Sequence, residues 1–343
     1  MAIIAGLDVG GAHLKVAIVE DGRPVQVEQI LCPLWQGMDK LEAALAAVRP
    51  MATGADMFAV TMTGELSDLF ESRQAGVEAL ARRIGAEFGP NVRFWAGRRG
   101  FGDAAYTIRH HTDVGSTNFL ATAAVVANRC RTALLVDFGS TTADVIPIVD
   151  RTPCPSGLND AVRQTTGELV YTGATRTAVM GVTQRAPFKG TWVELAREYL
   201  ATMADVRRIL GQLDDGIDLH ATADGRGKTL AESVARLARM LGREAADGGL
   251  ADWQQTARYI AECQLRAIHD GVLLALSRNP DLADGKLVGA GIGADVALTI
   301  GERVGLETTT FGALIGAPDA CRQSATHSAP AVAVAMLLAE EPG

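Results

Sequence analysis

The sequence predicts an α/β protein with two similar units that face each other across a cleft. The first observation is a repeat: residues 7–16 place an aspartate and small turn residues between two β-prone runs, and residues 136–145 repeat this order. The second is that each repeat begins a long alternation of strand-like and helix-like segments. The third is a late glycine-rich turn at residues 287–295, which can add a contact to the cleft.

Each repeat is typical of a β-hairpin whose tight turn exposes peptide N–H groups. Asp8 aligns with Asp137, and Gly10 aligns with Gly139. Small residues let a phosphate come close, and an aspartate at the end of the first strand can hold a hydrated Mg²⁺ that bridges phosphate oxygens. One such turn is common in ordinary hairpins, but a duplication with matched strands favours a pair of phosphate-binding turns.

Size and charge restrict the classes of protein to consider. With 343 residues, of which 48% are hydrophobic, the chain can bury a sizeable core in two domains of ordinary size. We expect these at residues 1–130 and 131–328, with a final helix at 329–340 that packs back on the first domain. The net charge of −8 disfavours a nucleic-acid or acidic-membrane partner, because such a surface gains little from counterion release.

Membrane insertion and disulfide bonding are not expected. No apolar run reaches the roughly 18 residues that span a bilayer, and the N-terminus has no basic leader, so we expect a cytoplasmic protein. The five cysteines are odd in number, far apart and never in a Cys-x-x-Cys pair. This spacing disfavours a disulfide framework or a zinc site.

In the first unit, three strand-like runs come first, and helix-like and strand-like runs then alternate. The strand-like runs are residues 3–7, 14–19, 25–31, 57–62 and 92–96, and the helix-like runs are 38–48, 72–88 and 121–128. Polar residues follow the strand at 57–62, where Glu65 stands, and Ser116 and Asn118 begin the last helix. Such positions at strand and helix ends often line a site.

In the second unit, strand, turn and strand are rebuilt at residues 133–149. Residues 164–173 then place Glu168 and Tyr171 between glycines, which favours a segment that determines specificity. Helical spacing dominates an insert at about residues 191–277, with helices expected at 192–200, 203–213, 230–241 and 253–276. Such an insert can serve as a lid or as the surface of a homodimer.

The late glycine turn formally matches the Gly-x-Gly-x-x-Ala fingerprint of dinucleotide-binding folds. Only about fifty residues follow Gly291, too few for the rest of such a sheet unless the chain folds back on earlier strands. We therefore interpret Gly289, Gly291 and Gly293 as a third contact to a phosphate or nucleoside.

The paired turns and the late Gly-x-Gly resemble the superfamily of acetate and sugar kinases, Hsp70 and actin. This resemblance implies two ribonuclease H-like (actin-like ATPase/sugar kinase) domains with a central cleft and a helical insertion in the second. The second turn, Asp-x-Gly-x-Thr-x-x-Asp at residues 137–144, is similar to that of hydantoinase and oxoprolinase relatives. Residues 6–12, 62–66, 115–118 and 167–173 together resemble the tetrahydromethanopterin-linked one-carbon pathway proteins, whose methanogen relatives include a methanofuran-biosynthesis synthase.

The resemblance implies roles for individual positions. Phosphate is held by the turn residues Gly10, Gly11, Gly139, Ser140, Thr141 and Thr142, and metal by the carboxylates of Asp8, Asp137 and Asp144. Ser116, Asn118 and Tyr171 are expected to bind the substrate. The first turn carries His13 and Lys15 where the second carries Thr142 and Asp144, so we expect different tasks, with Lys15 neutralising phosphate charge.

The activity implied is that of a transferase. It would join an aminomethylfuran diphosphate to a tyramine-type phenol, forming an aryl ether and releasing diphosphate. Asp8 and Asp137 would position Mg²⁺ at the leaving group, where negative charge develops. Glu65 and Glu168 are the candidate bases for the phenol proton, and surface or helix-capping roles remain open for both.

Two other classes of function remain open. An ATP-dependent small-molecule kinase of the same fold would use Asp8 or Asp137 as the base for an acceptor hydroxyl. A non-catalytic nucleotide-binding module would bind nucleotide tightly and turn over nothing. Acceptor-dependent release of ADP identifies the kinase, and release of diphosphate without ATP identifies the transferase.

Overall fold

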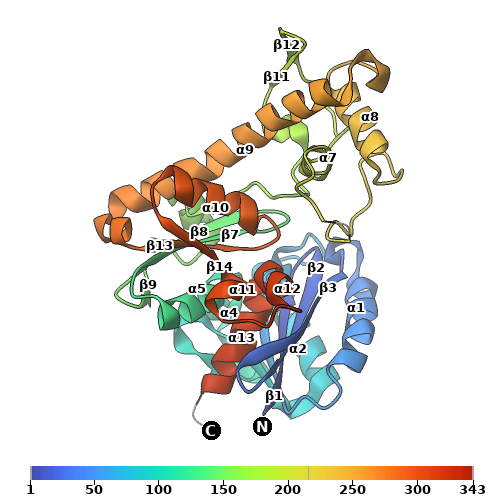
Figure 1. The fold of residues 1–343 in the computed structure, drawn as a ribbon. Coiled ribbons are helices and arrows are strands. Elements are labelled where there is room, and N and C mark those ends of the chain that lie inside the picture. Colours follow the sequence, from blue (N-terminus) through green and yellow to red (C-terminus); the bar gives the residue numbers. More distant parts are fainter. Residues whose placement is uncertain (1, 215, 342–343) are drawn as a thin grey trace.

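The computed structural model describes residues 2–214 and 216–341. Its first sheet has six strands in the order β3-β2-β1-β4-β5-β6 (Figure 1). The strands are β1 (Ile3–Val9), β2 (His13–Glu20), β3 (Arg23–Leu31), β4 (Met57–Met62), β5 (Val92–Trp95) and β6 (Phe101–Gly102). The first three form an antiparallel meander, and β4 and β5 continue from β1 in parallel.

The second sheet repeats this topology. It runs β10-β8-β7-β13-β14, with β9 also paired to β8. Its strands are β7 (Ala133–Phe138), β8 (Ala143–Val149), β9 (Thr152–Pro153), β10 (Leu169–Val170), β13 (Lys286–Ala290) and β14 (Glu307–Thr310). Because β7 and β8 are antiparallel while β13 and β14 run parallel to β7, the chain has two ribonuclease H-like halves, as expected.

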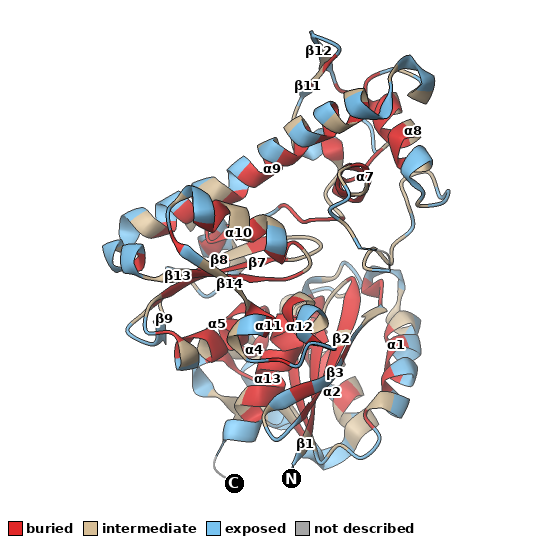
Figure 2. Cartoon of the chain, in the orientation of Figure 1, coloured by how far each residue is buried: buried red, intermediate tan, exposed pale blue. Residues whose placement is uncertain are grey.

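Helices cover both faces of the first sheet. Helices α1 (Met38–Met51) and α2 (Arg73–Phe88) pack on one face, and α5 (Asn118–Arg129) and α13 (Ala329–Glu340) on the other. The core that contains α5 and α13 also includes residues of β7, β8 and β13, so these helices lie between the two sheets. Figure 2 shows this central layer as mostly buried.

The last helix, α13, packs directly on β1. A Cβ atom at Gly6 would lie 2.0 Å from the carbonyl oxygen of Ala331 and 2.9 Å from the Cβ of Ala335. Only glycine allows so close an approach, so the chain's last helix is seated on its first strand.

The second sheet is covered on its outer face by α9 (Leu250–Arg278) and α10 (Ala294–Arg303). Short helices connect the remaining elements: α3 (Ala104–Arg109), α4 (His111–Val114), α6 (Asp160–Thr166), α11 (Phe311–Leu314) and α12 (Arg322–His327). None of the helices in residues 2–214 and 216–341 is long and apolar enough to cross a lipid bilayer.

The insert has its own core around Trp253 and differs in one element from the expectation. It contains α7 (Met203–Ile209), α8 (Leu230–Met240) and most of α9, but residues 192–200, all of them described, form no helix. That stretch begins instead with β12 (Thr191–Glu194), paired to β11 (Arg185–Phe188). The turn residues Lys189 and Gly190 both have positive φ, which suits a tight two-residue hairpin, and pairing overrides the local helical spacing.

Candidate active site

The two predicted turns have the same backbone geometry. The N–H of Gly10 donates to the carbonyl of His13 at 2.9 Å, and the N–H of Gly139 donates to the carbonyl of Thr142 at 2.9 Å. The repeat in the sequence is therefore a repeat in three dimensions, with each turn closing the hairpin that opens its domain.

The charges beside the turns differ. Asp8 lies opposite Lys15 in the register of β1 and β2, and their side chains are 3.4 Å apart. In the second hairpin, Asp137 lies opposite Asp144. Arg163 of α6 donates to Asp144 at 2.6 Å, so one of the two carboxylate oxygens of Asp144 is already engaged.

Both turns line one cavity of about 580 Å³. The predicted site residues that line it are Asp8, Gly10, Gly11, Lys15, Ser116, Asn118, Asp137, Gly139, Ser140, Thr141, Thr142, Asp144 and Tyr171. They come from both sheets and from the loops between elements, so the structure brings together most of the residues that the sequence singled out.

The cavity is rich in carboxylates. Of the described residues that line it, the acidic ones are Asp8, Asp68, Asp137, Asp144 and Asp160, and the basic ones are Lys15, Arg163 and Arg176. Burial raises the pKa of Asp137 to about 7, and the nearby Asp144 and Asp8 add to this shift against the opposing effect of Lys15. Burial also raises the pKa of Asp8. The crowding of carboxylates favours a bound cation.

The donor set fits a hydrated Mg²⁺ that shares its ligands with phosphate. One carboxylate oxygen of Asp8, Oδ1, is buried without a hydrogen-bond partner in the described chain. Within the same residues no group of three or more His, Cys, Asp or Glu side chains could enclose a metal. Mg²⁺ commonly takes one or two carboxylates and completes its shell with water and phosphate oxygens.

The segment after Tyr171 supports the second turn. The N–H of Ala174 donates to the carbonyl of Gly139 at 2.9 Å, and the N–H of Arg176 donates to the carbonyl of Ser140 at 3.0 Å. The guanidinium of Arg176 donates to the hydroxyl of Thr141 at 3.0 Å. Sequence reasoning missed Arg163 and Arg176, because neither belongs to a motif and only folding brings them to the turns.

Glu65 lies directly behind the cavity wall. It is 1% exposed, and the hydroxyl of Ser116 donates to its Oε1 at 2.7 Å. Burial raises the pKa of Glu65 to about 7, opposed by the hydrogen bond from Ser116 and by Arg73. Ser116 lines the cavity and Glu65 does not, so this candidate base reaches the site through the serine.

The other candidate base, Glu168, does not line the cavity. Its fully buried carboxylate accepts hydrogen bonds from the N–H and the hydroxyl of Ser156, at 2.9 and 2.6 Å. Arg278 of α9 approaches it to 3.5 Å. These contacts explain the glutamate as a tie between loops, and it is absent from the cavity lining, so the structure does not bring it together with the other candidates.

The third glycine turn does not offer the peptide N–H groups that we expected to contact a phosphate or nucleoside. The N–H groups of Gly291 and Gly293 donate to the carbonyls of Thr326 and Phe138 and thus are not free for phosphate. A Cβ at Gly291 would lie 2.5 Å from Oδ1 of Asp137, and one at Gly289 would lie 2.9 Å from the side chain of Leu298. These glycines allow close packing around β13, a role that a glycine motif cannot distinguish from ligand binding.

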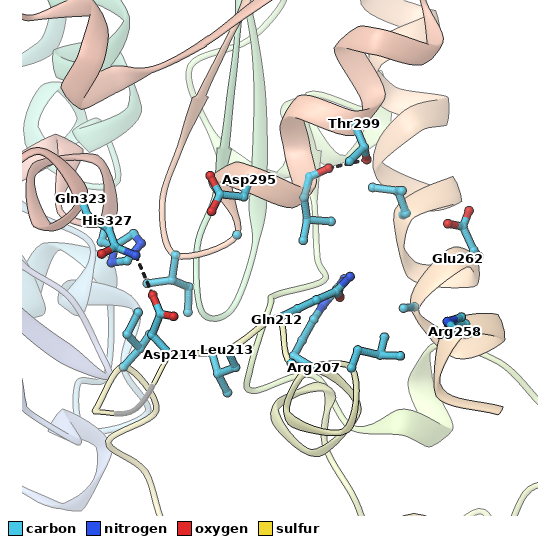
Figure 3. Close-up of a pocket in the computed structure, with 18 of the residues that line it drawn as sticks. Arg207, Gln212, Leu213, Asp214, Arg258, Glu262, Asp295, Thr299, Gln323 and His327 are labelled. Carbon is cyan, nitrogen blue, oxygen red and sulfur yellow. Dashed lines mark hydrogen bonds between the residues drawn. The ribbon is translucent and has the colours of Figure 1, made fainter. Parts of the chain in front are cut away.

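Gly293 lines a second cavity, of about 500 Å³. Figure 3 shows Arg207, Arg258 and Glu262 on one side and Asp295, Gln323 and His327 on another. The residues lining the two cavities do not overlap. The second cavity is thus separate from the first, and both polar and apolar side chains line it.

Comparison with known proteins points in the same direction as the paired turns. Over 240 residues the chain is 32% identical to the (4-{4-[2-(γ-L-glutamylamino)ethyl]phenoxymethyl}furan-2-yl)methanamine synthase of Methanocaldococcus jannaschii, covering 70% of this chain and 71% of that protein. A protein of the same name from Methanococcus vannielii is 32% identical over 117 residues, which is 34% of this chain and 52% of that protein.

A solved structure shares the fold. The nucleotide-free acetone carboxylase superposes with a TM-score of 0.52 at 11% identity, covering 89% of this chain and 68% of that one. Identity this low shows the fold alone. The hydantoinase/oxoprolinase family model matches residues 56–341, which include the second hairpin turn and the third glycine turn. Because this match extends over most of the chain, the protein belongs to the hydantoinase/oxoprolinase family.

Proposed function

We propose that this protein is a transferase of methanofuran-type cofactor biosynthesis, which joins an aminomethylfuran diphosphate to a tyramine-type phenol. The observation that carries the proposal is the shared cavity of the two aspartate turns in a chain 32% identical to a synthase of that pathway. The printed name of the relative describes a phenoxymethylfuran, which is an aryl ether, and both substrates must meet beside a diphosphate.

The cavity supplies the groups that such a reaction needs. The turn residues and Lys15 can bind and orient the diphosphate, and Arg176 adds a positive charge beside Thr141. Mg²⁺, held by Asp8 and Asp137, would supply positive charge where the leaving group gains negative charge. Exposed Tyr171 and half-exposed Trp35 offer apolar surface to the aromatic rings.

The reaction balances without another reagent. The bond between the methylene carbon and the diphosphate oxygen breaks, and the diphosphate leaves with the electron pair. The furan ring stabilises positive charge at the methylene carbon, to which the phenol oxygen bonds. The phenol loses one proton, so the products are the aryl ether and diphosphate.

A kinase is the second candidate, and the second cavity favours it. The cavity that Gly293 lines has about 500 Å³, enough for part of a nucleotide. It shares no lining residue with the cavity of the two turns. In this alternative, ATP would take the place of the diphosphate ester.

One experiment separates the two. The purified protein is incubated with Mg²⁺, an aminomethylfuran diphosphate and a tyramine-type phenol, with and without ATP. Ion chromatography and mass spectrometry should find equal amounts of diphosphate and aryl ether without ATP. Acceptor-dependent ADP and no ether would instead establish the kinase.

The paired aspartates give the first prediction. Asp8→Ala and Asp137→Ala should each lower ether formation at least about 100-fold, because each removes a group that stabilises the leaving diphosphate. Calorimetry should also show loss of Mg²⁺-dependent diphosphate binding. Glu307→Ala is the control, since Glu307 is exposed, pairs with Lys286 and does not line the cavity. Full activity of both aspartate variants would contradict the proposal.

A further inference from the structure

Ser116 and Glu65 form a contact that spans the cavity wall. Ser116 lines the cavity, and its hydroxyl donates to Oε1 of Glu65 at 2.7 Å. Glu65 is 1% exposed and lies in the short turn after β4. A carboxylate that water cannot reach is thus connected to the site through a single hydroxyl.

The surrounding backbone leaves room for this carboxylate. A Cβ at Gly115 would lie 2.9 Å from Oε1 of Glu65, and one at Gly76 would lie 2.5 Å from the backbone oxygen of Glu65. Glycines from two separate elements therefore make space for one glutamate. A residue with only a surface role would not need this fit.

Ser116 is held in an unfavourable backbone conformation. Its φ of 55° lies in the left-handed region, which costs a non-glycine residue about 1 kcal/mol or more. The hydrogen bond from its N–H to the carbonyl of Met62 at 3.2 Å, and the bridge between Met62 and Gly115, hold it there. Such strain recurs where a side chain must be aimed at a ligand.

Glu65 has the capacity to accept a proton. Its second oxygen, Oε2, has no hydrogen-bond partner in the described chain. Arg73 of α2 is 4.0 Å from Oε1 and also pairs with Asp160 of α6 at 3.5 Å, so its charge is shared between two carboxylates. With the pKa of Glu65 raised to about 7 by burial, the group can change protonation near neutral pH.

We propose that Ser116 and Glu65 form a proton relay for the phenolic acceptor, an assignment that rests on the proposed function. The phenol gives its proton to Oγ of Ser116 while the serine gives its own hydroxyl proton to Oε1 of Glu65. The phenol oxygen bonds to the methylene carbon, and the diphosphate leaves with the electron pair of the broken bond. Glu65 ends as a neutral acid and later returns the proton through Ser116 to water in the cavity.

The test compares Glu65→Gln and Ser116→Gly with the wild type. Glycine removes the hydroxyl and suits the left-handed backbone at residue 116. Two acceptors are used: a tyramine-type phenol and its ring-fluorinated analogue, whose more acidic hydroxyl needs less help from a base. Both variants should lose about 100-fold in kcat with the first acceptor and about tenfold or less with the second.

The pH profile gives a readout that a structural role would not change. In saturating Mg²⁺, whose positive charge would keep Asp137 ionised across this range, wild-type kcat/KM should rise as the pH increases through about 7, because Glu65 must be ionised to accept the proton. Glu65→Gln should lack this rise. Glu168→Gln is the matched control, since it alters another buried glutamate bonded to a serine but outside the cavity, and it should keep the rise.

Equal losses with both phenols, a rise that persists in Glu65→Gln, or wild-type kcat in Ser116→Gly would each overturn the relay. If Glu65→Gln does not fold, Ser116→Gly carries the same comparison of acceptors. Failure of the wild type to form an ether with either phenol would instead overturn the proposed function, so the two failures are distinguishable.

Discussion

At the residue scale, two buried glutamates differ in what their carboxylates contact. Glu168 accepts two hydrogen bonds from Ser156, and the guanidinium of Arg278 lies near its carboxylate. These donors and this positive charge compensate the charge of the glutamate. Glu65 accepts one hydrogen bond, from the hydroxyl of Ser116, and its other carboxylate oxygen has no partner among the described residues. Uncompensated burial disfavours the charged form of Glu65, which raises its pKa to about 7.

This difference predicts opposite effects of the same substitution. Because the folded-state pKa of Glu65 lies above its ordinary value of 4.5, its contribution to stability is full below pH 4.5 and is lost as the pH rises through 7. From pH 5 to pH 8, Glu65→Gln should therefore gain about 2 to 3 kcal/mol in unfolding free energy relative to the wild type. Glu168→Gln should lower this free energy at pH 8 by about 2 kcal/mol, because it removes satisfied contacts.

Urea unfolding at the two pH values measures both effects. Comparing the change between pH values cancels any fixed cost of placing the new amide of Glu65→Gln in the core. A difference between Glu65→Gln and the wild type that does not vary with pH would show that Glu65 keeps its ordinary acidity.

At the element scale, the contact between β1 and α13 joins the two ends of the chain. Strand β1 carries Asp8 to the cavity, and α13 packs on its other residues. The closest point is Gly6, where a Cβ would lie 2.0 Å from the carbonyl oxygen of Ala331. A shift of α13 would therefore move the strand that positions the first aspartate.

We expect Gly6→Ala to lower the unfolding free energy by about 3 kcal/mol, because the added methyl group overpacks a rigid backbone contact. Gly181→Ala is the control, since beyond its own stretch of backbone no described atom lies within 4 Å of the place that its Cβ would take, and its φ is not positive. It should change stability by no more than about 0.5 kcal/mol. Equal effects of the two substitutions in urea unfolding would contradict this packing.

At the scale of the whole molecule, the insert reaches from the second domain to the first. The ring of His220 stacks on that of Trp35, with 5.6 Å between the ring centroids. It also makes a T-shaped contact with the ring of His13, with 4.7 Å between the centroids. Gln29 donates to the carbonyl of Ile217 at 3.2 Å. These contacts hold the insert beside the cavity wall that His13 and Trp35 form.

The same contact predicts sensitivity to acid. Burial lowers the pKa of His13 to about 2 and that of His220 to about 4, and the positive charge of Arg176 adds to both shifts. A histidine with a lowered folded pKa contributes stability above its ordinary value of 6.5, and this contribution is lost as the pH falls. His220→Phe keeps an aromatic ring and should lose less stability, or gain more, than the wild type as the pH falls from 7 to 5.

The measurement is the urea midpoint of wild type and variant at both pH values, with hydrogen exchange of residues 216–222 as a local readout. His110→Phe, at an exposed position, is the control. A change in stability from pH 7 to pH 5 that is the same in wild type and His220→Phe would show that His220 does not contribute to it.

Sequence alone determined much of the local design. Short-range patterns predict the duplicated aspartate turns, the hairpins on either side and most helices. Hydrophobic periodicity and turn residues depend only on neighbours a few positions away along the chain. The convergence of Asp8 and Asp137 on one cavity also agrees with the prediction. Helix α13 begins and ends within two residues of the run that residues 331–339 indicated.

Only the tertiary structure decided which polar residues share the cavity. Glu65 and Glu168 look alike in sequence, yet packing places one behind Ser116 and ties the other to Ser156. The N–H groups of Gly291 and Gly293 are consumed by protein carbonyls that lie far away along the chain or on another strand. Contacts between distant segments set burial and hydrogen-bond partners, and these long-range terms are absent from any local pattern.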